Sequence, residues 1–294
     1  MEKKKNPLIY KLMLLTATIV WGGAFVVVKN TVNAVPPYTL LAVRFTLAAL
    51  LLLPLCIKRF KRLTADMLAK SLAISVFMFL GFALQTVGVQ STTPGKNAFL
   101  TAVYCVIVPF ICCFTEKKRP DAFNFAAGIL CLAGIGLVSP SGSLSINTGD
   151  ILTLLCGVAF SIAIVLVAKF GKDCDILLLT LIEFVSMAAL SWISSVFAHE
   201  SIAAVGWSSS VITSFVFLAL FSSCISTVFQ NVGQQHTDAS SASLILSLEA
   251  VFGVIFSVVF YGEAVTLKTA VGFVLIFAAV VVSETKLSFL KKAK

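Results

Sequence analysis

The sequence predicts an all-α membrane protein in which ten transmembrane helices form an inverted repeat of five plus five. Three observations lead to this prediction: a composition that suits lipid, ten long apolar segments, and motifs that recur half a chain apart. Hydrophobic residues make up 59% of the 294 residues, and charged residues make up only 12%. Because a soluble domain carries about 25% charged residues, most of this chain is expected to face lipid.

Ten apolar segments approach the length of roughly 20 residues that a membrane-spanning helix needs. The first is read as a mature helix, because no cleavage site of small residues follows it. The predicted spans are 10–29, 37–57, 69–90, 97–115, 121–139, 149–169, 176–197, 211–231, 241–261 and 267–284. Stretches that break helices or hydropathy separate several of them. These are PP at 36–37, KRFKR at 58–62, PG at 94–95, EKKRP at 116–120 and SPSGS at 139–143.

The basic residues predict the orientation, because cytoplasmic loops carry an excess of Lys and Arg. If the N-terminus is cytoplasmic, 18 of the 22 basic residues fall on the cytoplasmic side. The outer side then holds only Lys29, Lys96 and Lys268, and Arg44 falls inside a span. Both termini are therefore expected in the cytoplasm of a multi-pass protein of the cell membrane. The net charge of +9 is read as anchoring at an anionic leaflet, so no nucleic-acid partner is expected.

Two pairs of motifs indicate an internal repeat. Residues 85–92 read QTVGVQST and residues 230–237 read QNVGQQHT, with five of eight positions identical. Residues 40–50 (LLAVRFTLAAL) and 179–190 (LTLIEFVSMAAL) each place a charge before Phe and a run of small residues. Five spans per half is an odd number, so the second half must be inverted relative to the first. The predicted domains are residues 1–145 and 146–294.

The last predicted span of each half carries small residues seven positions apart. They are Ala127 with Gly134, and Gly272 with Ala279. Seven residues is about two helical turns, so each pair lies on one face and permits close helix approach. These faces could pack within one chain or join two chains in a homodimer, and the sequence leaves both open.

An inverted repeat favours a secondary transporter, in which substrate binds between the halves and access alternates between the two sides. The expected cargo is a small molecule, and proton coupling is left open. A sensor or scaffold without transport is the alternative. An enzyme is not expected: no HExxH, GxSxG or P-loop pattern occurs, and His199 and His236 both fall near span ends. A channel is disfavoured because no filter-like loop of Gly and Thr is present.

Four motifs resemble the EamA-type transporters of the drug/metabolite transporter superfamily. They are WGGAFVVVK at 21–29, Arg-Phe at 44–45, NAFLTAVYCVIVPF at 97–110 and SLEAVFGVIFSVVFYGE at 247–263. The resemblance covers nearly the whole chain, with one EamA unit in each half. It implies ten helices around a central cavity, cytoplasmic termini, and small metabolites or drugs as cargo that is often exported. The last motif commonly reads Leu-Glu-Pro, and Ala250 stands where the proline would kink the helix.

Three charged residues lie inside predicted spans, where a charge costs roughly 2.5–3.5 kcal/mol and therefore usually faces a cavity or a partner. Arg44 could grip a carboxylate, or it could contact backbone carbonyls or reach the outer interface. Glu183 could bind a cation or a proton, or it could reach the inner interface. Glu249 could exchange a proton, or it could join two helices by hydrogen bonds.

Two aromatic residues complete the predicted substrate-binding set of Trp21, Arg44, Tyr104, Glu183 and Glu249. Tyr104 is the repeat counterpart of Glu249 and could contact a ligand or only pack. Trp21 could line a cavity or anchor at the membrane interface. Gln85, Gln230 and Asn231 lie near span ends and could cap helices or line the exits. The eight Cys form no CxxC pair, so neither a metal nor another cofactor is expected.

Overall fold

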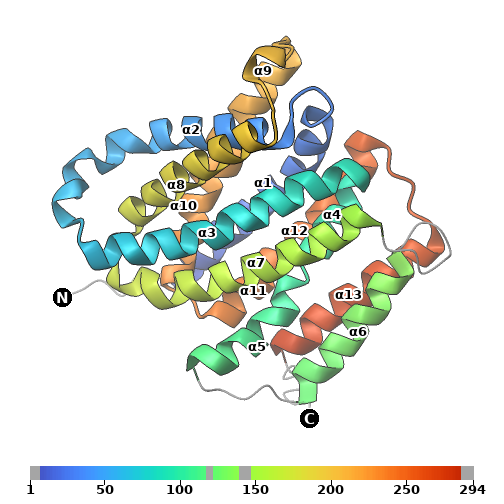
Figure 1. The fold of residues 1–294 in the computed structure, drawn as a ribbon. Helices are drawn as coiled ribbons and strands as arrows, with labels where there is room; N and C mark the ends of the chain where they lie inside the picture. Colours follow the sequence, from blue (N-terminus) through green and yellow to red (C-terminus); the bar gives the residue numbers. More distant parts are fainter. Residues whose placement is uncertain (1–6, 117–121, 139–146, 286–294) are drawn as a thin grey trace.

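The computed structural model describes residues 7–116, 122–138 and 147–285, and these residues form helices joined by short turns (Figure 1). The helices of the first half are α1 Pro7–Thr31, α2 Pro37–Cys56, α3 Ala65–Gly88, α4 Pro94–Thr101, α5 Tyr104–Glu116 and α6 Ala122–Val138. Those of the second half are α7 Thr148–Phe170, α8 Ile176–Phe197, α9 Ser209–Val216, α10 Ser226–Gln235, α11 Ala239–Ser247, α12 Glu249–Phe256 and α13 Leu267–Thr285. The all-α prediction is confirmed.

Eight helical segments are long and apolar enough to cross a membrane. The other two predicted spans, 121–139 and 267–284, fall on α6 and α13, which pack side by side at one edge of the bundle (Figure 1). Ala127 and Ala279, from the two small-residue faces, are fully buried. These two residues are therefore buried within one chain. A homodimer stays a prediction. Both termini, the domain boundary at 145–146, the break at 139–143 and most of that at 116–120 lie outside the described residues.

Proline and short polar side chains begin the helices where the sequence places them. Pro37 opens α2, where its missing N–H costs no helical hydrogen bond. Thr64, Thr93 and Asp238 accept hydrogen bonds from backbone N–H groups in the first turns of α3, α4 and α11. Asn147 and Asp150 form a reciprocal capping box at the start of α7. These caps fix the ends from which the long apolar helices extend.

Two of the predicted spans are interrupted part-way along their length. The span 97–115 is divided into α4 and α5, and the span 241–261 into α11 and α12. At both breaks the backbone hydrogen bonds connect residues three apart, from Val103 N–H to Leu100 and from Leu248 N–H to Ile245. Such tightened turns interrupt an α-helix without a proline. Tyr104 and Glu249 are the first residues after the two breaks.

The helices of the two halves pack against each other in several pairs. α2 packs on α8, α3 on α7 and α8, and α1 on α10 and α12 (Figure 1). The closest approach occurs where α1 crosses α12 and α12 crosses α4. A Cβ atom added at Gly22 would lie 2.4 Å from the Cβ of Phe252, and one at Gly253 would lie 2.4 Å from the Cβ of Ala98. These two glycines therefore hold three helices at backbone contact beside the centre of the molecule.

Charged residues tie helix ends together at both ends of the bundle. Asp175, at the start of α8, pairs with Arg59 and Arg62 beyond α2, each at 2.8 Å. Burial would raise the pKa of the Asp175 carboxyl, but the two guanidinium groups outweigh it and hold the pKa below its ordinary value. At the opposite end, Glu200 accepts a hydrogen bond from Thr39 N–H at 2.7 Å, in the first turn of α2. The helix pair α2 and α8 is thus fastened at both ends.

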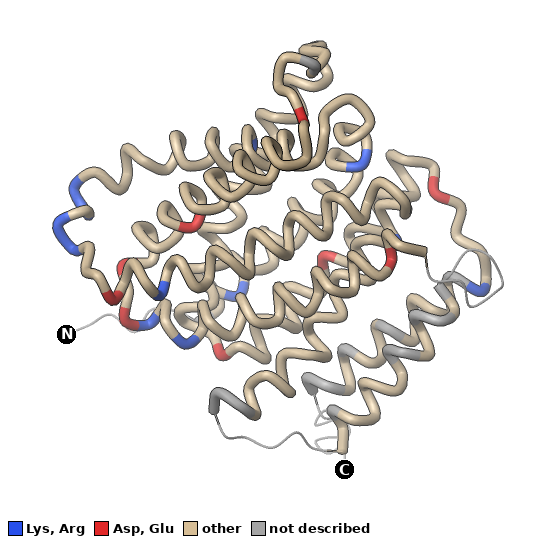
Figure 2. The backbone as a smooth tube through the Cα atoms, viewed as in Figure 1, with Lys and Arg blue, Asp and Glu red and all other residues tan. Residues whose placement is uncertain are grey.

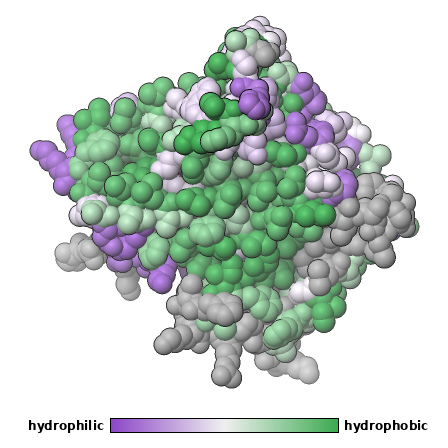
Figure 3. All heavy atoms as spheres, in the orientation of Figure 1, coloured by the Kyte–Doolittle hydropathy of each residue, from purple (hydrophilic) through white to green (hydrophobic). Residues whose placement is uncertain are grey.

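The surface separates into an apolar band and polar ends. Most Lys and Arg residues gather at one end of the bundle, on the left in Figure 2. Figure 3 shows hydrophobic residues across the middle of the molecule, with hydrophilic residues at the left edge and at the upper right. Large apolar side chains on the surface are strongly exposed, among them Phe197 at 80% and Leu267 at 83%. Such exposure suits lipid contact and would be unusual in water.

Candidate functional site

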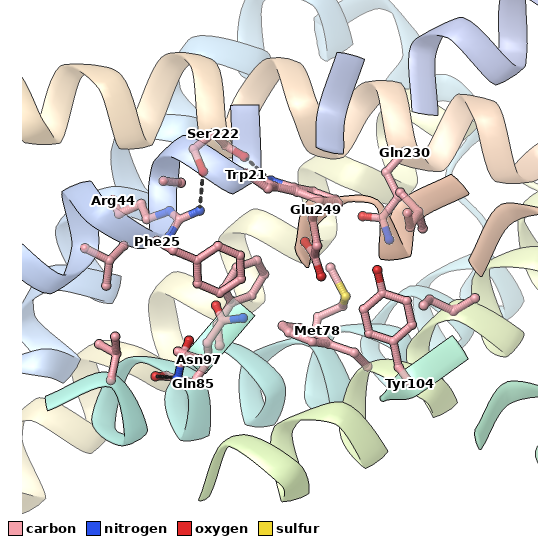
Figure 4. Close-up of a pocket in the computed structure, with 17 residues that line it drawn as sticks. Trp21, Phe25, Arg44, Met78, Gln85, Asn97, Tyr104, Ser222, Gln230 and Glu249 are labelled. Carbon is pink, nitrogen blue, oxygen red and sulfur yellow. Dashed lines mark hydrogen bonds between the residues drawn. The ribbon is translucent and has the colours of Figure 1, made fainter. Parts of the chain in front are cut away.

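A cavity lies at the centre of the helix bundle, lined mostly by apolar and aromatic side chains with a few polar groups among them, as small-molecule sites commonly are. Aromatic side chains form much of its wall: Trp21, Phe25, Phe82, Tyr104 and Phe160 (Figure 4). They come from four helices, α1, α3, α5 and α7, so residues from both halves of the chain enclose the space. The polar side chains in the wall are Arg44, Gln85, Asn97, Ser222, Gln230 and Glu249.

Four of the five predicted substrate-binding residues line this cavity. Trp21, Arg44, Tyr104 and Glu249 lie in its wall, whereas Glu183 does not. Gln85 and Gln230, which the sequence placed near span ends, also reach the cavity. Asn97 and Ser222 were not singled out as site residues. A lone amide or serine in an apolar run is a weak signal, since helices tolerate both by bonding to their own backbone.

Arg44 is buried without a negatively charged partner. The residue is only 3% exposed. Its Nε atom donates to the Ser223 hydroxyl at 2.6 Å, and its Nη2 atom donates to the Ser222 hydroxyl at 3.0 Å. The guanidinium carbon lies 5.0 Å from the centre of the Phe82 ring. No described carboxylate lies within 4.0 Å of it. Two neutral hydroxyls and a ring face leave its positive charge uncompensated, so an anionic group entering the cavity would be attracted to it.

The segment that holds Arg44 also holds Trp21. Ser222 and Ser223 belong to η5 (Phe217–Ile225), a π-helical stretch that joins α9 to α10. The Trp21 indole N–H donates to the Ser222 backbone carbonyl at 2.8 Å (Figure 4). This bond fixes the ring as a cavity wall, so Trp21 does not act as an interfacial anchor. A π-helical stretch inside a long helix is often found at functional sites, and this one carries contacts to two cavity residues.

Glu249 and Tyr104 face each other across another part of the cavity (Figure 4). Both residues are buried, and each is the first residue of a half-helix, α12 and α5 respectively. No Lys or Arg among the described residues pairs with Glu249. The cavity therefore presents one carboxyl group and one guanidinium group that are not neutralised by each other.

Amide side chains support the wall between these charges. Gln85 donates to the Thr101 hydroxyl at 3.2 Å, and Asn97 donates to the Thr153 hydroxyl at 2.8 Å. The Asn97 and Gln230 side-chain oxygens accept no hydrogen bond from the described residues. Buried polar atoms are usually paired, so these oxygens are available to a solute that brings hydrogen-bond donors.

Glu183 lies outside the cavity wall, between α8 and α10. It is fully buried, which is incompatible with a side chain that reaches the inner interface. The Asn231 amide donates to its Oε2 atom at 2.7 Å and also to the Thr180 hydroxyl at 2.9 Å. Arg44 and Glu183 form no ion pair. The two charges that match each other in the repeat thus occupy different surroundings.

Metal ligation finds no support in the described part of the chain, where no group of three or more His, Cys, Asp or Glu residues could hold an ion. None of the seven described cysteines forms a disulfide with another described cysteine. The arrangement of the cavity is that of a binding site: aromatic walls, opposite charges and unpaired amide oxygens.

Comparisons with known proteins agree with a membrane-transport role. The sequence pattern of the EamA-like transporter family matches residues 8–139 and again residues 147–285. An uncharacterized transporter of Archaeoglobus fulgidus is 31% identical over 269 residues, which is 92% of this chain and 83% of that protein. The uncharacterized transporter YyaM of Bacillus subtilis is 28% identical, with 93% of this chain and 92% of YyaM covered.

Two further matches extend this picture. The uncharacterized inner membrane transporter YedA of Escherichia coli is 28% identical over 72% of this chain and 70% of its own length. A solved crystal structure with 17% sequence identity superposes on 96% of this chain and 98% of its own, with a TM-score of 0.73. At this identity, the structural match indicates a shared fold alone.

Proposed function

This chain belongs to the EamA-like transporter family and is a multi-pass membrane protein, and from that premise we propose that it is a secondary transporter of a small organic solute. The observation that carries the proposal is the central cavity, with its unpaired guanidinium and carboxyl groups and its aromatic walls. The transport step is alternating access across the cell membrane, and the proposed direction is export. Family membership also points away from an enzyme.

The pattern of helix packing supports an inverted repeat of ten helices. If each first-half span is exchanged for its second-half counterpart, the contact of α3 with α7 becomes that of α1 with α10. In the same way, the contact of α1 with α12 becomes that of α7 with α5. The two interrupted spans break just before Tyr104 and Glu249, which are also counterparts. Halves that match in this way can exchange conformations, which is the basis of alternating access.

The distribution of charge supports cytoplasmic termini. The turn between α2 and α3 carries Lys58, Arg59, Lys61 and Arg62, and it lies at the basic end of the bundle in Figure 2. The N-terminal end of α1 belongs to this same end of the bundle, because α1 and α2 run in opposite directions. By the positive-inside rule this end faces the cytoplasm.

The cavity charges favour an amino-acid-like solute over an uncharged drug. A carboxylate of the solute would bind at Arg44, where bidentate hydrogen bonding is geometrically suited to a carboxylate. An ammonium group would bind at Glu249, and the aromatic rings would contact an apolar body and the cation. Each charge of the protein would then gain, on binding, the partner that it lacks in this structure.

The test compares medium and cell contents by untargeted metabolite analysis. Cells that overproduce the native protein are set against cells that produce an Arg44→Ala, Glu249→Gln double variant at matched abundance. We expect one or a few amino-acid-like metabolites to accumulate in the medium only with the native protein. The variant Lys61→Gln, which removes an exposed charge, is the control and should export like the native protein.

Other outcomes separate the alternatives. An equal shift with the double variant would retain a transporter and remove the site assignment. Flux that rises linearly to high solute concentration would indicate a channel, whereas saturable flux with counterflow would indicate a carrier. Solute binding without any flux or counterflow would favour the sensor or scaffold.

A further inference from the structure

Glu183 is a buried carboxyl group that does not line the cavity. It is fully buried on α8, and α2, α3 and α10 pack against that helix. Only one of its oxygens is engaged: Oε2 accepts the Asn231 amide at 2.7 Å, whereas Oε1 has no hydrogen-bond partner among the described residues. A carboxylate placed this deeply without a counter-charge is costly, and a bound proton removes that cost.

No charged group on the neighbouring helices neutralises Glu183. On α2, Arg44 is engaged with Ser222 and Ser223. On α3, Lys70 pairs with Asp66 near the cytoplasmic end, at 2.7 Å. Helix α10 contains no charged residue, and Asp175, which precedes α8, pairs with Arg59 and Arg62. A proton is therefore the simplest positive charge that Glu183 could take up.

Helix α10 presents a stripe of unpaired polar groups next to Glu183. Thr227, Gln230, Asn231 and Gln234 are buried, and each has a side-chain polar atom without a hydrogen-bond partner among the described residues. Spacings of three and four residues place them along one side of the helix. Gln230 belongs to the cavity wall, and Gln234 lies one turn nearer the end of α10. The stripe connects the surroundings of Glu183 with the cavity through groups that can donate and accept hydrogen bonds.

We propose that Glu183 is a proton-binding site, distinct from the solute cavity, and that Oε1 takes up the proton. The reaction is reversible protonation of one carboxylate, with water as the source and the acceptor of the proton. The site is linked to the cavity by one continuous segment, since η5 carries the serines that hold Arg44 and runs directly into α10 with Asn231. Protonation weakens the hydrogen bond from Asn231 to Glu183, which is one of the two that Asn231 on α10 makes to α8, and so loosens the contact between these helices.

This link deepens the proposed function, because it gives a carrier its coupling to a proton gradient. The proton site itself can be tested without any transport. Purified native protein in detergent is treated with dicyclohexylcarbodiimide, a hydrophobic reagent to which a protonated carboxyl group adds across one C=N bond. Peptide mass mapping then locates the adduct. We expect an adduct on Glu183 that is lost as the pH is raised, and absence of an adduct on Glu183 at every pH would overturn the proposal.

A second measurement tests the same site with variants. Infrared difference spectra between acidic and alkaline buffer report carboxylic-acid groups that lose a proton. We expect one such band to be lost in Glu183→Gln and retained in Glu249→Gln, with Ser191→Ala on the same helix as a folding control. If Glu183→Gln does not fold, Glu183→Asp should shift the band without removing it. A band that is unchanged in both Glu183 variants would contradict the proposal.

The coupling role is tested separately in proteoliposomes, with the solute that the metabolite comparison identifies. We expect Glu183→Gln to retain counterflow and to lose accumulation driven by an imposed pH gradient. Accumulation equal to that of the native protein would overturn the coupling role. If the native protein moves no solute while the adduct and the infrared band are present, the carrier function fails and the proton site stands.

Discussion

Two buried cations in this protein have opposite surroundings. Lys96, on α4, is 5% exposed and lies 2.7 Å from the Asp150 carboxylate on α7. Arg44, on α2, is 3% exposed and meets only two serine hydroxyls and aromatic rings. The first charge is neutralised within the protein, and the second is not. From this difference we propose that the neutralised charge holds helices together and that the unpaired charge serves a ligand.

The buried carboxyl groups divide in the same way. Asp150 has Lys96 as its partner and also caps α7, so its role is fully accounted for by structure. Glu249 in the cavity and Glu183 behind it have no cationic partner among the described residues. Because each unpaired charge reduces stability, we propose that binding accounts for both, of a solute at Glu249 and of a proton at Glu183.

The largest effect is expected from breaking the neutralised pair. Asp150→Asn keeps the shape of the side chain and leaves the Lys96 ammonium buried without a counter-charge. We expect the free energy of unfolding to fall by about 3–5 kcal/mol, measured by denaturation of the purified protein in detergent. Adding Lys96→Met to Asp150→Asn should recover most of the loss. If the double variant is no more stable than Asp150→Asn alone, the loss of stability does not come from an unpaired Lys96 ammonium, and the contrast between Lys96 and Arg44 fails.

A second substitution, Arg44→Gln, addresses the unpaired charge. Its removal should leave the unfolding free energy unchanged or raise it, because its partners are two neutral hydroxyls and no opposite charge is left buried and unpaired. Solute affinity should fall by about 10- to 100-fold, since a charge-assisted hydrogen bond contributes about 1.5–3 kcal/mol. Counterflow at graded solute concentrations measures this, with Lys61→Gln as the matched control. A loss of stability like that of Asp150→Asn, with transport intact, would assign Arg44 a structural role.

Substitutions at two neighbouring glycines test the contribution of helix packing near the cavity to stability without changing any charge. Gly22→Ala places a methyl group 2.4 Å from the Cβ of Phe252, whereas Gly23→Ala meets only the Phe256 ring at 3.7 Å. We expect Gly22→Ala to lower the unfolding free energy by about 1–3 kcal/mol and Gly23→Ala to leave it unchanged or raise it. Thermal denaturation of the two variants in parallel provides the test. Equal stabilities would mean that α1 and α12 are not in backbone contact.

The smallest effect is expected at the partly exposed cluster of Asp175 with Arg59 and Arg62. The folded-state pKa of Asp175 is lowered, so its contribution is present above the pKa of the unfolded state and is lost as the pH falls through the folded-state value. We expect Asp175→Asn to cost at most about 1 kcal/mol at neutral pH and nothing in strong acid. Unfolding measured from neutral to acidic pH checks this, and a constant difference across that range would exclude the ion pairs as its cause.

The charges that define the site could be predicted from the sequence, because Arg44 and Glu249 are conspicuous in apolar runs. The helical interruptions could not. Ala250 stands in place of the expected proline, yet the chain still tightens at Leu248, through backbone geometry that tertiary packing imposes. Glu183 was expected to bind substrate, but only the packing of α8 on α10 places it behind the cavity wall. The sequence does not mark Asn97 as a site residue, because the position of its amide becomes visible only from its hydrogen bond to Thr153 in the folded chain.

The most direct test of the central claim uses paired solutes that differ in one charge. Counterflow is measured for the amino-acid-like solute that the metabolite comparison identifies and for its methyl ester, which lacks the carboxylate. The unpaired guanidinium of Arg44 predicts that the native protein exchanges the acid and discriminates against the ester, and that Arg44→Gln loses this discrimination. Equal exchange of acid and ester by the native protein, or undiminished discrimination in Arg44→Gln, would contradict the claim that the uncompensated charge is kept for the ligand.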